Sequence, residues 1–333
     1  MVLLGMPPAD RELALSEPVP LCDAHGRLHP GAVGWSRQPL CRAALPRGWP
    51  RRKRWHHWCV TSPAEVVALT FGDVDYLGIG ALFHLDLGTG RAIRRTTVRP
   101  GGWPGGVPDD ARTGRVTVDG LGLSLDLQAD PGGVSLRGRA RGLAVDLRVT
   151  RPPGHESLSV VIPWSATRFA FTTKENTLPA SGTLELGGRT RSLADGAFAC
   201  LDFGRGLWPY RTSWNWAAAS GRQGDRVVGL NLGARWTDGT GLDENALTVD
   251  GRLEPIEGGV RFAFDPRDLH APWRIHGPAV ELELRPVFAQ RLRLPLLVAS
   301  ADLAMVFGHI TGRVLGRPIE HLFGWAEELF ARW

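Results

Sequence analysis

The sequence contains little lysine: Lys53 and Lys174 are the two lysines among 39 lysine and arginine residues, and the net charge is +5. The one dense basic run is residues 51–54, with the sequence RRKR. The run is short and no nucleic-acid-binding motif surrounds it, so we expect no nucleic-acid partner. We interpret it as a solvated loop. Contact with phosphates or anionic lipid is the alternative.

The four cysteines form no CxxC pair, which excludes a zinc ribbon. The first dozen residues include acidic and polar ones and lack the apolar core of a signal peptide, so we expect a cytoplasmic protein with reduced thiols. Residues 294–312 are mostly apolar and long enough to span a membrane. Pro295, Asp302 and His309 interrupt this stretch. It therefore predicts buried strands joined by a turn, and no transmembrane segment.

Motifs for common cofactors and nucleophiles are also missing. The glycine-rich residues 100–106 lack the GK[ST] ending of a phosphate loop, and neither GxGxxG nor GxSxG occurs in a suitable context. His56 and His57 lie between two tryptophans but lack a third ligand at usable spacing. We therefore predict no cofactor and no metal site. Strand alternation would place one histidine beside a tryptophan on each face, with His57 lining a core or a pocket.

Most of the chain shows the period-two pattern of β-strands. Glycine (42 residues) and proline (25 residues) are abundant and spread along the chain, as tight turns between short strands require. This pattern predicts an all-β barrel or sandwich in two halves. We expect an irregular N-terminal segment (1–54), an N-terminal half (55–180), a C-terminal half (181–318) and a helix (319–333). The helix is predicted from apolar residues at helical spacing: Ile319, Leu322, Phe323, Ala326, Leu329 and Phe330.

The segment 202–216 concentrates chemical groups in fifteen residues. Alternation places Trp214 and Trp216 on one strand face and Asn215 on the other, which is typical of a cavity wall. Asp202 follows an apolar run and is predicted near a strand end. In an apolar cavity, desolvation would raise the pKa of Asp202 and make it a general acid. The alternative is a structural ion pair with Arg205 or Arg211.

Two further segments supply candidate acids. Lys174 and Glu175 are adjacent, so they face opposite ways on a strand. Glu175 would form a carboxylate pair with Asp202 if their strands adjoin, and a surface turn with solvated charges is the alternative. Glu244 and Asn245 precede a predicted strand and would line the polar end of a pocket. Turn capping explains these two residues nearly as well.

Several of these segments together resemble the DUF2804 family, a group of uncharacterised bacterial and fungal proteins. The matching residues are 35–37, 55–58, 174–182, 202–216, 244–247 and 324–328. More remotely, the chain is similar to the lipocalin-like group of carotenoid 1,2-hydratases, AttH-type proteins and Diels–Alderase-type cyclases. In that group an Asp-His-x-Trp-Gly element precedes a Trp-x-Trp strand. Here Asp202, Gly206, Trp214 and Trp216 match, whereas Phe203 and Arg205 replace the histidine and tryptophan.

This resemblance implies two lipocalin-like antiparallel β-barrel or sandwich halves around a ligand cavity. We expect an acid-assisted lyase or hydratase, isomerase or cyclase acting on an apolar or amphipathic small molecule. Asp202 is the predicted proton donor, with Glu175 or Glu244 as a second acid or base. The predicted substrate contacts are Lys174, Asn176, Arg205, Tyr210, Arg211, Trp214, Asn215, Trp216, Asn245 and His57.

Two other functions fit the same residues. One is a non-enzymatic carrier of a lipid or polyene. The other is a carbohydrate-active enzyme that binds a glycan on tryptophan platforms and uses paired carboxylates about 5 to 9 Å apart. The oligomeric state is left open by the sequence.

Overall fold

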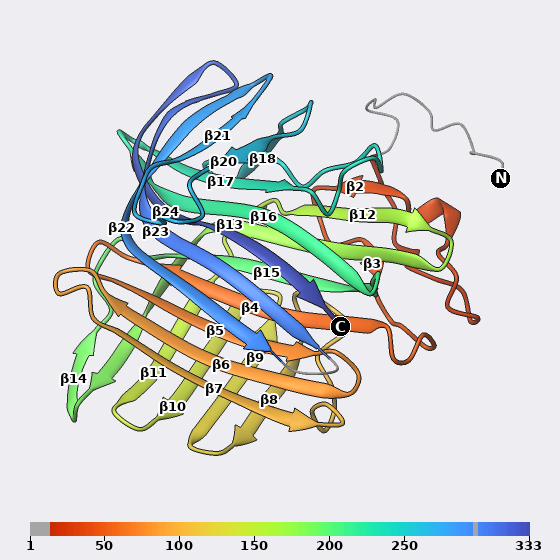
Figure 1. Ribbon diagram of the computed structural model, residues 1–333, viewed down its shortest axis with the longest axis horizontal. Coiled ribbons are helices and arrows are strands. Elements are labelled where there is room, and N and C mark those ends of the chain that lie inside the picture. The colour runs from red at the N-terminus through yellow and green to blue at the C-terminus, as the bar shows by residue number, and fades with distance from the viewer. Residues whose placement is uncertain (1–13, 296–298) are drawn as a thin grey trace.

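The computed structural model describes residues 14–295 and 299–333, which form two large antiparallel β-sheets (Figure 1). The predicted all-β, lipocalin-like fold is confirmed. Within the described residues the structure has no α-helix, and its one 3₁₀ turn is η2 (Pro30–Ala32). A small parallel pair joins β1 (Val19–Pro20) and β3 (Cys41–Arg42).

The first sheet forms a nearly closed barrel. Over the described residues it has 13 strands, and its end strands approach each other because β7 packs beside β8 and β9. Its interior is filled by large apolar side chains such as Trp58, Phe71 and Phe203. The main path runs β7 (Ala92–Pro100), β6 (Leu77–Asp86), β5 (Glu65–Asp73), β4 (Arg52–Thr61), β15 (Phe198–Leu207), β13 (Arg168–Leu186), β11 (Leu143–Thr150), β10 (Gly133–Ala140), β9 (Leu123–Asp130) and β8 (Gly114–Gly120). Three short neighbours are β2 (Gly34–Ser36), β12 (Leu158–Ser165) and β14 (Arg189–Ser192).

The second sheet is a half-barrel of nine strands in the described part of the chain. One face carries its own apolar core, which includes Leu230, Trp273 and Ile310. Its order is β19 (Arg252–Pro255), β18 (Ala246–Val249), β17 (Arg226–Ala234), β16 (Arg211–Gln223), β24 (Arg317–Arg332), β23 (Ser300–Val314), β22 (Val280–Pro295), β21 (Trp273–Gly277) and β20 (Arg261–Ala263).

The outer face of the barrel packs against the other face of the half-barrel. Cys59 and Cys200 from the barrel meet Trp216, Phe307 and Trp325 from the second sheet in one buried cluster. Strands in this position are buried on both faces, so successive residues serve different cores. Side chains on the outward face of β4 and β15 therefore define what lies between the sheets.

Strand β4 shows the alternation expected from its sequence. His56 and Trp58 are neighbours, with ring centroids 5.9 Å apart, and Trp58 belongs to the barrel core. His57 faces the second sheet, where its ring lies 6.4 Å from that of Trp216. One histidine therefore lies beside an aromatic residue on each face, as predicted.

The predicted C-terminal helix is wrong, because residues 317–332 form β24 between β16 and β23. The helical spacing has a local cause. The register with β23 shifts between Ile310 and Gly312, and His321 has a positive φ of 47°. This bulge places Ile319 and Leu322 on one face although they are three residues apart. The four-residue step from Leu322 to Ala326 fits a strand and a helix equally well.

The interpretation of the basic run as a solvated loop is also wrong. Residues 52–54 of the run open strand β4, where Arg52 pairs with Asp75 at 2.7 Å and Arg54 pairs with Asp73 at 2.6 Å. Lys53 is fully buried. Arg52 and Arg54 are neutralised by these carboxylates, whereas the partners of Lys53 are the backbone carbonyls of Pro50 and Val74.

The chain passes from the first sheet to the second between β15 and β16. The division into 55–180 and 181–318 stays a prediction about domains. Within the described ranges, no helix has the length and apolar character needed to cross a membrane.

Candidate functional site

A pocket of about 270 Å³ lies between the two sheets. Its first wall is the outward face of the barrel strands, and its second wall comes from the half-barrel together with the loop before β18. Aromatic side chains dominate the second wall, whereas the first wall combines three aromatic residues (Trp55, Phe83 and Trp208) with charged, polar and aliphatic ones. The lining includes Lys53, Trp55, His57, Thr70, Phe83, Arg94, Thr172, Lys174, Asp202 and Trp208 from the first wall, and Trp214, Trp216, Trp236, Glu244, Met305, Phe307, Trp325, Glu327 and Trp333 from the second.

Lys174 is the centre of a buried charged group in this pocket. Strand pairing places Lys174 directly opposite Asp202, and its Nζ lies 2.7 Å from Asp202 Oδ1. The same Nζ lies 3.3 Å from Glu244 Oε2 and 4.2 Å from the ring centre of Trp216. One ammonium group therefore bridges a carboxylate from each wall while it lies over an aromatic face.

Burial and these contacts set the charges of the group. Burial opposes ionisation of Lys174, but the carboxylates of Asp202 and Glu244 raise its pKa above the ordinary value. Burial raises the pKa of Glu244, which the Lys174 charge partly offsets. The Trp236 indole N–H also donates to Glu244 Oε1 over 2.8 Å. Lys174 is thus a fixed cation rather than a proton donor.

Glu327 is a third acid of the pocket, and it was not predicted from the sequence. It is 7% exposed, and burial, reinforced by the charge of Asp202, raises its pKa to about 7. Its Oε1 accepts a hydrogen bond of 2.8 Å from the Trp214 indole N–H. Strand alternation from Trp325 would have placed Glu327 on the same face, but the helical interpretation of this segment concealed it.

His57 lines the pocket as an uncharged ring. Its Nδ1 lies 2.8 Å from the Thr70 hydroxyl, and burial lowers the pKa of His57 to about 4. A neutral imidazole contributes a polar surface at neutral pH without adding a further positive charge beside Lys174.

Asp202 differs in two ways from its prediction. It lies in the middle of β15 and not near a strand end. Its ion-pair partner is Lys174, not Arg205 or Arg211. Arg205 lies three residues away on the opposite face, where it donates to the carbonyls of Ala43, Val107 and Pro108 and pairs with Asp109.

The structure does not bring Glu175 together with Asp202. Glu175 faces the barrel interior, where Arg112 and Arg151 hold its two oxygens at 2.7 and 2.8 Å. Lys174, the preceding residue, points to the other face of β13 and lies opposite Asp202 in the pocket. The expected carboxylate pair is therefore replaced by Asp202 and Glu244, with Lys174 between them.

Four other predicted residues lie outside the pocket. Asn176 joins the sheets: its Nδ2 donates to the Leu230 carbonyl and its Oδ1 accepts from the Cys200 thiol. Asn245 Oδ1 accepts the Gly233 N–H at 2.7 Å. Asn215 is buried and its Nδ2 donates to the backbone carbonyl of Glu327, and Tyr210 is 43% exposed, with Arg51 over its ring at 5.0 Å.

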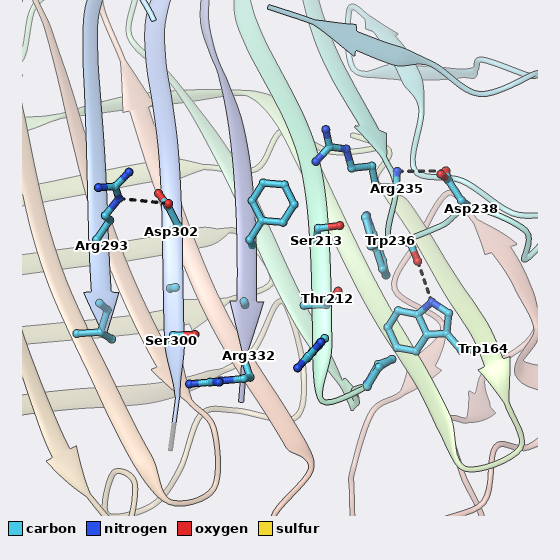
Figure 2. A pocket seen from close by; sticks show the side chains of 16 residues that line it. Trp164, Thr212, Ser213, Arg235, Trp236, Asp238, Arg293, Ser300, Asp302 and Arg332 are labelled. Atoms are coloured by element: carbon cyan, nitrogen blue, oxygen red, sulfur yellow. Dashed lines mark hydrogen bonds and ion pairs between the residues drawn. The ribbon is translucent and has the colours of Figure 1, made fainter. Parts of the chain in front are cut away.

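Arg211 lines a separate surface groove of about 670 Å³ at one end of the half-barrel (Figure 2). Arg293 and Asp302 are cross-strand neighbours on β22 and β23 and pair at 3.3 Å, and the Trp164 indole N–H donates to the carbonyl of Trp236. Among the described residues, Trp236 alone lines both the groove and the pocket. The acids that line the groove in the described structure are Asp238 and Asp302, and neither is buried.

The packing of Trp55, which lines the pocket, requires glycine at position 204. A Cβ at this position would overlap the indole ring of Trp55, which lies flat against β15. We expect Gly204→Ala to displace Trp55 and lower the free energy of unfolding by about 1–3 kcal/mol. Urea unfolding measures this change. Gly88→Ala is the control, because its new Cβ would make only an ordinary 3.5 Å contact with Asp86; equal effects of both variants would contradict the prediction.

The fold has relatives among solved structures. An AttH-like protein from Nitrosomonas europaea matches with a TM-score of 0.53 and 13% identity over 84% of this chain and 92% of that one. Kievitone hydratase from Nectria haematococca matches with a TM-score of 0.55 and 12% identity over 84% and 88% of the two chains. CghA with Sch210972 matches with a TM-score of 0.51 and 13% identity over 85% and 88%. At this identity the likeness concerns the fold.

A search of curated proteins by sequence found no match. In residues 14–295 and 299–333, no group of three or more His, Cys, Asp or Glu is placed to hold a metal ion. The family resemblance, by contrast, extends over nearly the whole sequence, since the DUF2804 family, a domain of unknown function, matches residues 12–333. The chain belongs to the DUF2804 family.

Proposed function

We propose that the pocket between the sheets binds an apolar or amphipathic unsaturated molecule and catalyses its acid-assisted hydration, isomerisation or cyclisation. The observation that carries this proposal is Glu327. It is a buried carboxyl with a pKa of about 7, set in an aromatic pocket and facing ionised groups on the opposite wall. A carboxylic acid with this pKa is about half protonated at neutral pH and can still release its proton readily.

Glu327 therefore takes the role of proton donor that the sequence analysis gave to Asp202. The Lys174 ammonium group at 2.7 Å stabilises Asp202 as a carboxylate, which suits a base or a charge stabiliser. Among the described residues, no cation is in contact with the Glu327 carboxyl, and its one hydrogen bond comes from the Trp214 indole N–H.

The reaction begins when Glu327 transfers its proton to one carbon of a double bond, which leaves positive charge on the other carbon. The faces of Trp214 and Trp216 stabilise that charge. In a hydration, water adds to the cation and Asp202 takes the proton that the water loses. In an isomerisation, Asp202 removes a proton from a neighbouring carbon. In a cyclisation, a hydroxyl group of the same molecule closes on the cation and Asp202 takes the proton that the hydroxyl loses.

One protein of similar fold bears the name kievitone hydratase, which supports a hydration among the three proposed reactions. It does not identify the substrate of this chain. A glycosidase is less suited to the geometry. In a glycosidase the bond to be cleaved lies between the two carboxylates. Here the Lys174 ammonium group occupies the space between Asp202 and Glu244.

The test is solvent isotope incorporation. The protein is incubated in D₂O with a panel of small polyenes, terpenoid alcohols and prenylated phenols, and the products are analysed by mass spectrometry. We expect deuterium on carbon or addition of water with the natural protein. We expect a loss of at least about 100-fold with Glu327→Gln, since the amide has no acidic proton to donate.

Glu328→Gln is the matched control, because Glu328 lies on the other face of β24 and pairs with Arg235 at 2.8 Å. If panel members bind and neither protein incorporates deuterium, the pocket is a carrier site. If Glu327→Gln and the natural protein react equally, Glu327 is not the donor.

A further inference from the structure

The pocket has a second end that is built from hydrogen-bond donors and begins at Lys53, further along β4 from His57, which pairs with Asp202. We call it the tryptophan end and define it as Lys53, Trp55, Trp208 and Trp333, all of which line the pocket. The ring of Trp208 lies 5.3 Å from that of Trp55 and 6.0 Å from that of Trp333. Lys53 Nζ lies 5.7 Å from the ring centre of Trp333.

The indole N–H groups of the pocket fall into two sets. At the acid end, Trp214, Trp216 and Trp236 donate to Glu327, Asn231 and Glu244, each over 2.8 Å. At the tryptophan end, the buried N–H groups of Trp55, Trp208 and Trp333 have no acceptor among the described residues. One further indole in this condition, Trp58, belongs to the barrel core.

Lys53 adds a positive charge that no carboxylate neutralises directly. Its Nζ donates to the carbonyls of Pro50 and Val74 at 3.2 and 3.3 Å, and it forms no ion pair within the described parts of the chain. Arg52 and Arg54 engage the nearby Asp73 and Asp75 instead.

The two lysines of the pocket therefore differ. Lys174 contacts two carboxylates, whereas Lys53 is fully buried with backbone carbonyls as its partners. Burial lowers the pKa of Lys53 to about 8, as expected for an ammonium group without a counter-ion. An ammonium group has three donors, and two are in use.

We propose that the tryptophan end binds the carboxylate of an amphipathic ligand whose apolar body extends towards Glu327. The carboxylate would accept from the third N–H of Lys53 and from unpartnered indole N–H groups. This arrangement neutralises a buried cation and satisfies buried donors in one step. The proposal rests on the proposed function for the identity of the pocket, and it adds the chemical class of the substrate: a compact unsaturated acid.

The experiment compares two probes of nearly equal size, 2-naphthoate and 2-naphthalenemethanol, by isothermal titration calorimetry at pH 7. We expect the natural protein to bind the acid about tenfold more tightly than the alcohol, as a charged hydrogen bond would give. Lys53→Met should remove that preference and leave the affinity for the alcohol within about twofold. Lys53→Arg, which keeps the charge, should retain part of the preference.

Arg293→Met is the control, since Arg293 lies on the surface groove and is 68% exposed. It should leave both affinities unchanged. Equal binding of acid and alcohol by the natural protein, or no saturable binding of 2-naphthoate, overturns the proposal. So does a folded Lys53→Met variant that keeps the preference for the acid. Should Lys53→Met fail to fold by circular dichroism, the comparison in the natural protein and in Lys53→Arg decides.

These outcomes are separate from those of the proposed function. The naphthyl probes report binding without turnover, whereas the isotope assay reports turnover by molecules that need not carry a carboxylate. A protein that incorporates deuterium but does not discriminate between the probes keeps its proposed function and loses the carboxylate site.

Discussion

Glu327→Gln is expected to make the protein more stable above pH 7 and to change its stability little at pH 4.5. The buried carboxyl has a pKa of about 7 in the folded protein, against an ordinary value of 4.5. Between these two pH values the unfolded chain releases a proton that the folded chain keeps, so the stability of the natural protein falls as pH rises. Above pH 7 the accumulated difference is about 3 kcal/mol.

Glutamine avoids this loss because it has no proton to release, and its carbonyl oxygen can still accept from Trp214. Urea unfolding of both proteins at pH 5 and pH 8 gives the comparison. The difference is taken at each pH, since His56 and His57 also titrate on acid unfolding: burial lowers their pKa values to about 3 and about 4.

Glu328→Gln controls for the loss of one negative charge from β24. Glu328 pairs with Arg235, whose side chain is 36% exposed, so we expect a change within about 1 kcal/mol at both pH values. A difference between Glu327→Gln and the natural protein that is the same at pH 5 and pH 8 would show that Glu327 is not desolvated.

Lys174→Met is expected to have the opposite effect and to destabilise the protein by about 3–5 kcal/mol at pH 7.5. The substitution removes the one cation in contact with Asp202 and Glu244 and leaves two carboxylates together without a counter-ion. Breaking one partner of a buried ion pair costs about this much. The free energy of unfolding in urea measures the loss.

Two further variants test the cause. Adding Asp202→Asn and Glu244→Gln to Lys174→Met should recover most of the stability, because no uncompensated charge is left. Lys53→Met should cost much less, since Lys53 has no carboxylate partner in the described structure. If Lys174→Met unfolds at the same urea concentration as the natural protein, the charged group does not act as an ion-pair network.

The fold could be predicted from the sequence where neighbouring strands are also neighbours along the chain. Strands β8 to β11 pair in sequence order with clean alternation of buried and exposed residues, which is readable directly. Strand β24 could not be read in this way. Residues Gly324 to Glu328 are buried on both faces, and the bulge at His321 changes the period, so the pattern imitates a helix.

Part of the site could also be predicted from residue types and strand alternation. Lys174, Asp202, Glu244, Trp214, Trp216 and His57 all line the pocket, and each had been chosen for its residue type. Their roles stay predictions. Alternation alone separates Glu175 from Lys174 and Arg205 from Asp202. What the sequence does not contain is the non-local packing of β24 against the barrel, and this packing brings Glu327 to the site.

Both lysines of the chain line one pocket. All the other lysine and arginine positions of the sequence are arginines. Arginine stays charged at every pH at which the protein folds, so the titration of side-chain amines reports on the pocket alone. Because lysine is scarce, a signal from a lysine side chain comes from the pocket and not from the protein surface. An isotope label on the lysine side chains would give two signals, one from each end of the ligand site.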